Sequence, residues 1–140
     1  MGLAFNAIEL QAYMNEIFPQ VAEDFAIDAL SEEGITMRLK VAERHLRPGG
    51  TVSGPAMFSL ADCTVYALVL SRLGAKALAV TTNCSLDFMR KPEAGRDVIA
   101  TGTLLKLGRS LAVGDVHLRS EGSDKLVARS TMTYSIPPAR

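Results

Sequence analysis

The sequence predicts an α+β domain in which an antiparallel sheet of about five to six strands wraps around one long central helix, after a short N-terminal helix. Apolar and polar residues alternate through residues 25–41 and again through 78–136, whereas residues 55–71 form one apolar stretch with a single charge. The chain has 140 residues, of which 48% are hydrophobic, so we expect one domain with a substantial core over residues 1–140.

A helix and a hairpin are expected at the N-terminus. The segment NAIELQAYMNEIF (residues 6–18) spaces its apolar residues as one face of a helix does and precedes Pro19, which predicts a helix within residues 1–20. Residues 25–41 alternate around the turn Glu32–Gly34, which predicts a hairpin. One strand should place on a single face Phe25, Ile27 and Ala29, and the other strand Ile35, Met37, Leu39 and Val41.

The apolar stretch predicts a helix over residues 54–73. Ser53 or Gly54 can cap this helix, Pro55 suits its first turn, and Gly74 can end it. Because the helix is apolar on nearly all sides, it should be buried. We expect a core helix rather than a membrane span, since the stretch is short for a bilayer and contains a carboxylate.

The rest of the chain predicts antiparallel strands. Residues 97–107 turn into 111–119, and these turn into 126–136. In the strand before them, one face should hold Leu78, Val80, Cys84, Leu86 and Phe88, and the other Thr81, Asn83, Ser85 and Asp87. Such a sheet leaves one face and its edges uncovered, so we expect an oligomer.

The composition argues against several classes of partner. Fifteen basic and fifteen acidic residues cancel, which favours neither nucleic acid nor an anionic membrane. The two cysteines, Cys63 and Cys84, and the two histidines, His45 and His117, have no metal-ligand spacing. Residues 1–8 do not resemble a signal peptide. We therefore expect a cytoplasmic protein without metal, with both cysteines buried and reduced.

Asp62 is the single charge in the apolar stretch. Charged side chains are rarely buried without a partner or a function. A carboxylate among apolar neighbours is poorly solvated, which makes it a candidate base or nucleophile. A structural carboxylate that caps or bonds a loop is the alternative, and the chemistry alone leaves both readings open.

The segment GPAMFSLAD (Gly54–Asp62) is similar to the helix-start motif of the phenylacetic-acid-pathway (PaaI-like) thioesterases of the hotdog-fold superfamily, in which His-Gly-Gly and apolar residues precede Leu-Ala-Asp. TTNCSLDFMRKP (residues 81–92) resembles the next strand of that family, and LLKLGRSLAVGDVHL (residues 104–118) its next hairpin. The resemblance implies the hotdog fold and hydrolysis of acyl-coenzyme A thioesters. It implies no cofactor other than the coenzyme A of the substrate.

The resemblance also implies roles for three residues. Asp62 matches the nucleophile or general base, the backbone N–H of Gly54 would polarise the thioester carbonyl, and Thr81 matches a side chain that holds the attacking water. A purely structural role stays open for each of them. Asp62 could be a structural carboxylate, Gly54 a sterically favoured helix start, and Thr81 an ordinary strand residue.

Three positions depart from the family pattern. Ser53 replaces the usual His, Pro55 the second Gly, and Arg47 the usual Asn. Pro55 has no N–H to donate, so one donor remains at the helix start. Arg47 could pair with Asp62, hold a substrate carboxylate, or be a solvated loop residue.

Further candidates would bind the substrate. Tyr66 lies one turn after Asp62 and could line the acyl pocket, hydrogen-bond Asp62, or serve as a core residue. Basic residues at strand ends and turns could bind the phosphates of coenzyme A or only aid solubility, and they are Arg90, Lys91, Arg96 and Arg109.

The spacing of Gly54 and Asp62 bears on assembly. Eight residues of helix span about 12 Å, so one thioester carbonyl cannot touch both residues of one chain. The resemblance implies a site at a homodimer interface, with each subunit supplying one of the two residues, in a homodimer or a homotetramer.

Two other functions stay open: a hydratase or dehydratase that uses His45, and a non-catalytic acyl-coenzyme A-binding protein.

Overall fold

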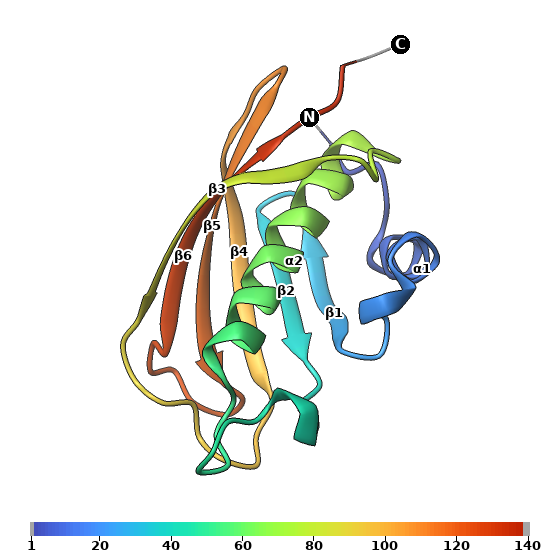
Figure 1. The fold of residues 1–140 in the computed structure, drawn as a ribbon. Coiled ribbons are helices and arrows are strands. Elements are labelled where there is room, and N and C mark those ends of the chain that lie inside the picture. Colours follow the sequence, from blue (N-terminus) through green and yellow to red (C-terminus); the bar gives the residue numbers. More distant parts are fainter. Residues whose placement is uncertain (1, 139–140) are drawn as a thin grey trace.

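The computed structural model describes residues 2–138, which form one six-stranded sheet curled around a long helix (Figure 1). Neighbouring strands are antiparallel throughout, in the order β1-β2-β4-β5-β6-β3. The strands are β1 (Phe25–Ser31), β2 (Gly34–Leu39), β3 (Val80–Phe88), β4 (Val98–Leu107), β5 (Leu111–Ser120) and β6 (Ala128–Ser135). This arrangement confirms the predicted α+β fold class.

The central helix α2 spans Gly54–Leu73, the range predicted from the sequence. The Oγ atom of Ser53 caps it by accepting a hydrogen bond from the N–H of Ala56 at 3.2 Å, and Gly74 ends it with a φ of 82°. By length and composition α2 could cross a membrane, but 72% of its most apolar window is buried inside the fold. Its apolar surface is therefore that of a core helix.

Two glycines let α2 lie close to the middle of the sheet. A Cβ atom added to Gly102 of β4 would lie 2.8 Å from Cγ2 of Thr64, and one added to Gly114 of β5 would lie 3.0 Å from both methyl carbons of Val65. Interiors are packed too densely to absorb such atoms without movement. The absence of side chains at these two positions thus sets how closely helix and sheet approach.

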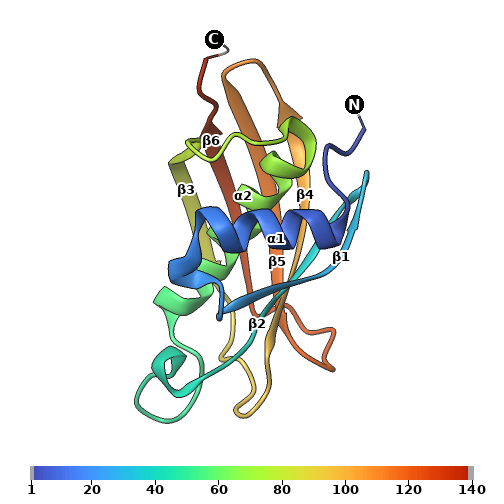
Figure 2. The same ribbon diagram turned by 90° about the vertical axis from the view of Figure 1, so that its right-hand side faces the viewer.

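Helix α1 (Ala7–Ile17) crosses in front of α2 and packs against β1 (Figure 2). Asn6 begins it through a reciprocal cap with the glutamate three residues later. Leu10 and Met14 point into the core, as the predicted helix face requires. A short 3-10 turn, η1 (Pro19–Val21), follows α1 and leads to β1.

The hairpin of β1 and β2 differs from its prediction on one strand. β2 has the predicted buried residues, which are Ile35, Met37 and Leu39. In β1 the register shifts between Ile27 and Ala29, so Ala29 lies opposite Thr36 and is exposed, whereas Leu30 packs against the core. The prediction that Ala29 shares the face of Ile27 is wrong because a bulge adds one residue to this edge strand.

The two cysteines also differ from each other. Cys63 on α2 is buried, as predicted, and both cysteines are free thiols. Cys84 is exposed, and the prediction that it is buried is wrong. It lies on β3, which is an edge strand, while α2 packs mainly against the central strands β4 and β5.

Candidate active site

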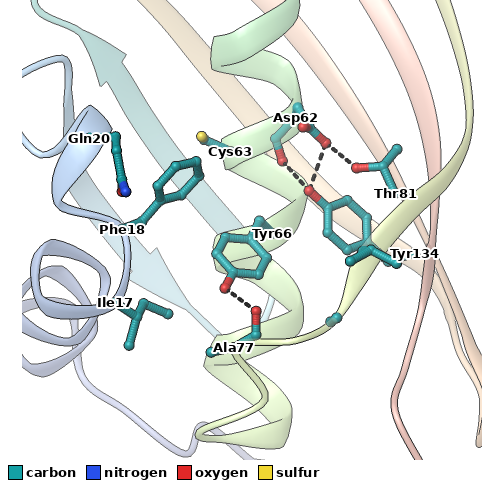
Figure 3. A pocket seen from close by; sticks show the side chains of 11 residues that line it. Ile17, Phe18, Gln20, Asp62, Cys63, Tyr66, Ala77, Thr81 and Tyr134 are labelled. Atoms are coloured by element: carbon teal, nitrogen blue, oxygen red, sulfur yellow. Dashed lines mark hydrogen bonds between the residues drawn. The ribbon is translucent and has the colours of Figure 1, made fainter.

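Asp62 lies in the middle of α2, and its side chain points toward β3 and β6 (Figure 3). The hydroxyl of Thr81 donates to Oδ1 of Asp62 at 2.5 Å. The hydroxyl of Tyr134 lies 2.6 Å from the same Oδ1 and 3.0 Å from the main-chain oxygen of Asp62. No residue from 2 to 138 donates a hydrogen bond to Oδ2. One carboxylate oxygen is held, and the other is available for chemistry.

A bulge in β3 directs Thr81 at Asp62. The register of β3 against β6 shifts between Thr81 and Asn83, with Thr82 as the additional residue. Thr81 pairs with Tyr134, which points inward, and therefore points inward itself (Figure 3). Simple alternation predicted that Thr81 shares a face with Asn83, which is wrong at the bulge. Bulges near functional sites commonly redirect a side chain in this way.

Tyr134 was missed by sequence reasoning. Its alternation with Met132 and Ile136 marks it as an inward-facing residue of β6, but no pattern in the sequence shows which residue of α2 it meets. Burial raises the pKa of Tyr134, and the charge of Asp62 and its hydrogen bond raise the pKa further. The hydroxyl therefore stays protonated and remains a donor at physiological pH.

Cys63 neighbours Asp62 and lines the same pocket. Burial raises the pKa of Cys63 to about 12, and the negative charge of Asp62 contributes in the same direction. Because the thiolate is the nucleophilic form of cysteine, a thiol with this pKa does not attack a thioester at neutral pH. Cys63 acts here as an apolar wall residue.

A pocket of about 430 Å³ adjoins the carboxylate of Asp62. This volume falls within the range of small-molecule sites. Residues of α2 form one wall, and β3 and β6 form a second (Figure 3). The end of α1 and the following turn supply the opposite wall with Ile17, Phe18 and Gln20. The pocket is thus bounded by four separate segments of the chain.

Tyr66 lines this pocket, which was one of its predicted roles. The alternative, a hydrogen bond to Asp62, is wrong, because the Tyr66 hydroxyl donates to the main-chain oxygen of Ala77 at 2.6 Å. Its ring stacks against Tyr134 with centroids 5.9 Å apart and an interplanar angle of 24°. Burial raises the pKa of Tyr66, so its hydroxyl also stays protonated.

Gly54 offers a free backbone donor at the start of α2. Within residues 2–138 its N–H donates to no acceptor, whereas the Ser53 side chain is occupied as the helix cap. The ring of Phe88 lies next to Gly54, and an added Cβ would be 3.4 Å from its Cζ. An unpaired N–H at the positive end of a helix can stabilise a developing oxyanion.

The basic candidates do not reach the pocket within one chain. Arg47 is exposed in the loop before α2, and its Nη1 donates to the main-chain oxygen of Pro48 at 3.2 Å. Arg90 and Lys91 are exposed just after the end of β3. Arg109 lies in the turn between β4 and β5, near the opposite end of β3. Arg109 therefore cannot share a phosphate with the other two in a single chain.

His45, the base of the hydratase alternative, belongs to a structural network. The residue is only 7% exposed. Its Nδ1 accepts a hydrogen bond from the N–H of Ala42 at 2.9 Å, so its proton is on Nε2, which faces Oδ1 of Asp24 at 3.1 Å. With both ring nitrogens engaged, His45 is poorly suited to acid–base work. In the described part of the chain, no group of three or more His, Cys, Asp or Glu side chains is arranged to hold a metal ion.

Comparisons with known proteins found similar sequences and similar structures. The family model described as the thioesterase superfamily matches residues 49–127. The crystal structure of a candidate thioesterase from Silicibacter sp. TM1040 has 67% identity and a TM-score of 0.93, and covers 99% of this chain and 96% of its own.

Two further relatives are more distant. Acyl-coenzyme A thioesterase 13 of Mus musculus is 28% identical over 117 residues, which is 83% of this chain and 82% of that protein. A variant of the phenylacetic acid degradation protein PaaI from Thermus thermophilus is 28% identical with a TM-score of 0.73, covering 85% of this chain and 99% of its own. These similarities confirm the predicted hotdog fold and the PaaI-like resemblance.

Proposed function

This chain belongs to the thioesterase superfamily and is a thioester hydrolase, and we propose that it cleaves acyl-coenzyme A thioesters to the free acid and coenzyme A. The observation that carries the proposal is the position of Asp62. Its carboxylate is held by Thr81 and Tyr134 on the wall of a pocket that is large enough for an acyl group. A thioester whose acyl group fills this pocket brings its carbonyl carbon next to the carboxylate.

Asp62 acts through Oδ2 in the proposed reaction. As a general base, Oδ2 takes a proton from water while the water oxygen attacks the carbonyl carbon. The tetrahedral intermediate then collapses, the C–S bond breaks, and the proton passes to the sulfur of coenzyme A. As a nucleophile, Oδ2 instead attacks the carbonyl and expels the thiolate, and water then opens the resulting anhydride. In both routes Thr81 and Tyr134 orient the carboxylate through Oδ1.

A second copy of the chain would complete the site. The free N–H of Gly54 lies about 12 Å along α2 from Asp62, too far to bind the same carbonyl oxygen. Exposed apolar side chains lie at the first turns of α2, on β3 and just after β3, and they are Phe58, Val80, Phe88 and Met89. Such a surface favours burial against a partner. We propose a homodimer in which the partner subunit's Gly54 faces Asp62, and a homotetramer of two such dimers.

The coenzyme A moiety would bind near the start of α2. The ring of Phe88 lies next to Gly54, and Arg90 and Lys91 follow just after Met89, so these two cations lie near the proposed oxyanion donor. Both can pair with phosphate oxygens. Arg109 would contribute only from another subunit, and Arg47 is free to contact the partner or the substrate. We expect the enzyme in the cytoplasm.

Release of free thiol from a panel of acyl-coenzyme A substrates tests the proposal. We expect Asp62→Asn to lower turnover by at least the roughly 10²–10⁴-fold that loss of a general base costs, with fold and substrate binding retained. Ser59→Ala, at an exposed position on the same helix, is the matched control and should keep the wild-type rate.

Three results would contradict the proposal. Full turnover by Asp62→Asn would make the carboxylate structural. Saturable binding by the wild type without turnover would identify an acyl-coenzyme A-binding protein. Hydration of an enoyl-coenzyme A would identify a hydratase.

A further inference from the structure

We propose that Phe18 sets the size of the acyl group, so that the turn after α1 determines substrate specificity. The inference rests on the thioesterase function proposed above and concerns the end of the pocket opposite Asp62. This turn lies outside residues 49–127, the range matched by the family model.

Three aromatic rings lead from the carboxylate to the far wall. Tyr134 bonds Asp62, and the ring of Tyr66 stacks on that of Tyr134 at 5.9 Å. Phe18 then meets Tyr66 edge-on, with centroids 6.4 Å apart and an interplanar angle of 86° (Figure 3). An acyl chain whose carbonyl lies at Asp62 and which extends along Tyr66 therefore ends against Phe18.

Phe18 is also the least constrained of the three rings. The hydroxyls of Tyr66 and Tyr134 are anchored, and these residues are only 8% and 3% exposed. Phe18 is half-buried and its side chain has no polar anchor, while its N–H donates to the main-chain oxygen of Met14 at 2.8 Å. A substitution at Phe18 therefore changes the length of the pocket without removing a hydrogen bond.

The lining also indicates the chemical class of the acyl group. Among the described residues that line the pocket, Asp62 is the one charged side chain, and the far wall is mainly apolar. An acyl group with its own carboxylate would bury that charge against the apolar far wall without a compensating cation. The pocket therefore fits uncharged, apolar acyl groups whose length is limited by Phe18.

Steady-state hydrolysis of straight-chain acyl-coenzyme A substrates from acetyl to palmitoyl tests the inference. We expect Phe18→Ala to raise the kcat/KM ratio of long to short chains by about tenfold or more, because added pocket length admits further methylene groups. Phe18→Trp should shift the ratio in the opposite direction. Ile8→Ala, at an 83% exposed position on α1, is the control and should keep the wild-type profile.

The outcomes separate this inference from the proposed function. If the wild type is active and both Phe18 variants have its chain-length profile, the proposed role of Phe18 is overturned and the thioesterase function is not. A wild type that hydrolyses none of the substrates would overturn the thioesterase proposal itself. Lost stability lowers all rates together and leaves the ratio unchanged. If Phe18→Ala does not fold, Phe18→Leu replaces it as the shortened side chain, and the comparison with Phe18→Trp decides.

Discussion

The phenolic oxygen of Tyr134 lies 2.6 Å from Oδ1 of Asp62, although the two residues are 72 positions apart in the sequence. The raised pKa of Tyr134, caused first by burial and then by the charge of Asp62, keeps this hydroxyl a donor. The hydroxyls of Tyr134 and Thr81 both bond Oδ1 of Asp62, which leaves Oδ2 available for chemistry. The last strand of the sheet thereby positions a group on the central helix.

Removal of this donor should affect the chemical step. We expect Tyr134→Phe to lower kcat with little change in KM, because Asp62 loses a fixed orientation while the pocket keeps its shape. A hydrogen bond to a charged group is worth about 1.5–3 kcal/mol, which corresponds to about 10- to 100-fold in rate. Tyr13→Phe removes a hydroxyl outside the pocket and serves as the control. An unchanged kcat per folded molecule would assign Tyr134 to stability only.

Thr81 allows a test by conservative rescue. We expect Thr81→Ala to reduce kcat and Thr81→Ser to restore most of it, because serine keeps the hydroxyl that donates to Asp62 at 2.5 Å. Rates are measured with one acyl-coenzyme A at saturation, and folding is checked by circular dichroism. Equal rates for the alanine and serine variants would show that the methyl group or the bulge matters, and not the hydrogen bond.

The close approach of helix and sheet predicts a stability effect. We expect Gly102→Ala to lower the free energy of unfolding by about 1–3 kcal/mol, because its Cβ would lie 2.8 Å from Thr64 and neighbouring side chains must move. Thr101→Ala, at the exposed neighbouring position, is the control. Urea unfolding of both variants measures the difference. A fully stable Gly102→Ala would show that the sheet can move away from α2 at little cost.

The buried thiol of Cys63 predicts a loss of stability at alkaline pH. In the unfolded chain Cys63 ionises near its ordinary pKa of 9.0, whereas in the folded chain its pKa is about 12. The folded chain therefore keeps this proton to a higher pH than the unfolded chain does. The free energy of unfolding is unaffected by the ionisation of Cys63 below pH 9 and decreases as the pH rises from about 9 to about 12. The slope is at most about 1.4 kcal/mol per pH unit.

Comparison with Cys63→Ala isolates this contribution, because alanine has no proton to lose. We expect urea unfolding to show that the free energy of unfolding of wild type, relative to that of Cys63→Ala, decreases steadily above pH 9. A gap that stays constant to pH 11 would mean that the Cys63 thiol ionises equally in both states.

Local signals predicted most of the fold. The bounds of α2 follow from Ser53, Pro55 and Gly74, each of which acts within one turn of the helix end, and these signals can be read from a single stretch of sequence. The alternation in β2 and β6 likewise identified their buried faces, since the pairing of β2 with β4 and that of β6 with β5 contain no register shift.

The pairing between segments that are distant in the sequence could not be predicted from such local signals. The bulges near Ala29 and Thr82 are defined by one strand against another, and the composition of a single strand does not reveal the additional residue. Asp62 was found because it is the single charge in the apolar stretch of residues 55–71. Its partner Tyr134 was not, because an inward tyrosine on a strand looks like any other core residue until the register with α2 is known.

The rigid helix α2 fixes the distance between the two residues that it contributes to the proposed site, Gly54 and Asp62. Gly54 and Asp62 belong to the same uninterrupted, buried helix, so their separation cannot stretch or bend to suit a substrate. Deleting one residue between them would rotate Asp62 by about 100° and shift it by about 1.5 Å relative to Gly54. In a two-fold dimer the same error would occur twice, once at each composite site, and neither Thr81 nor Tyr134 could follow the carboxylate around the helix.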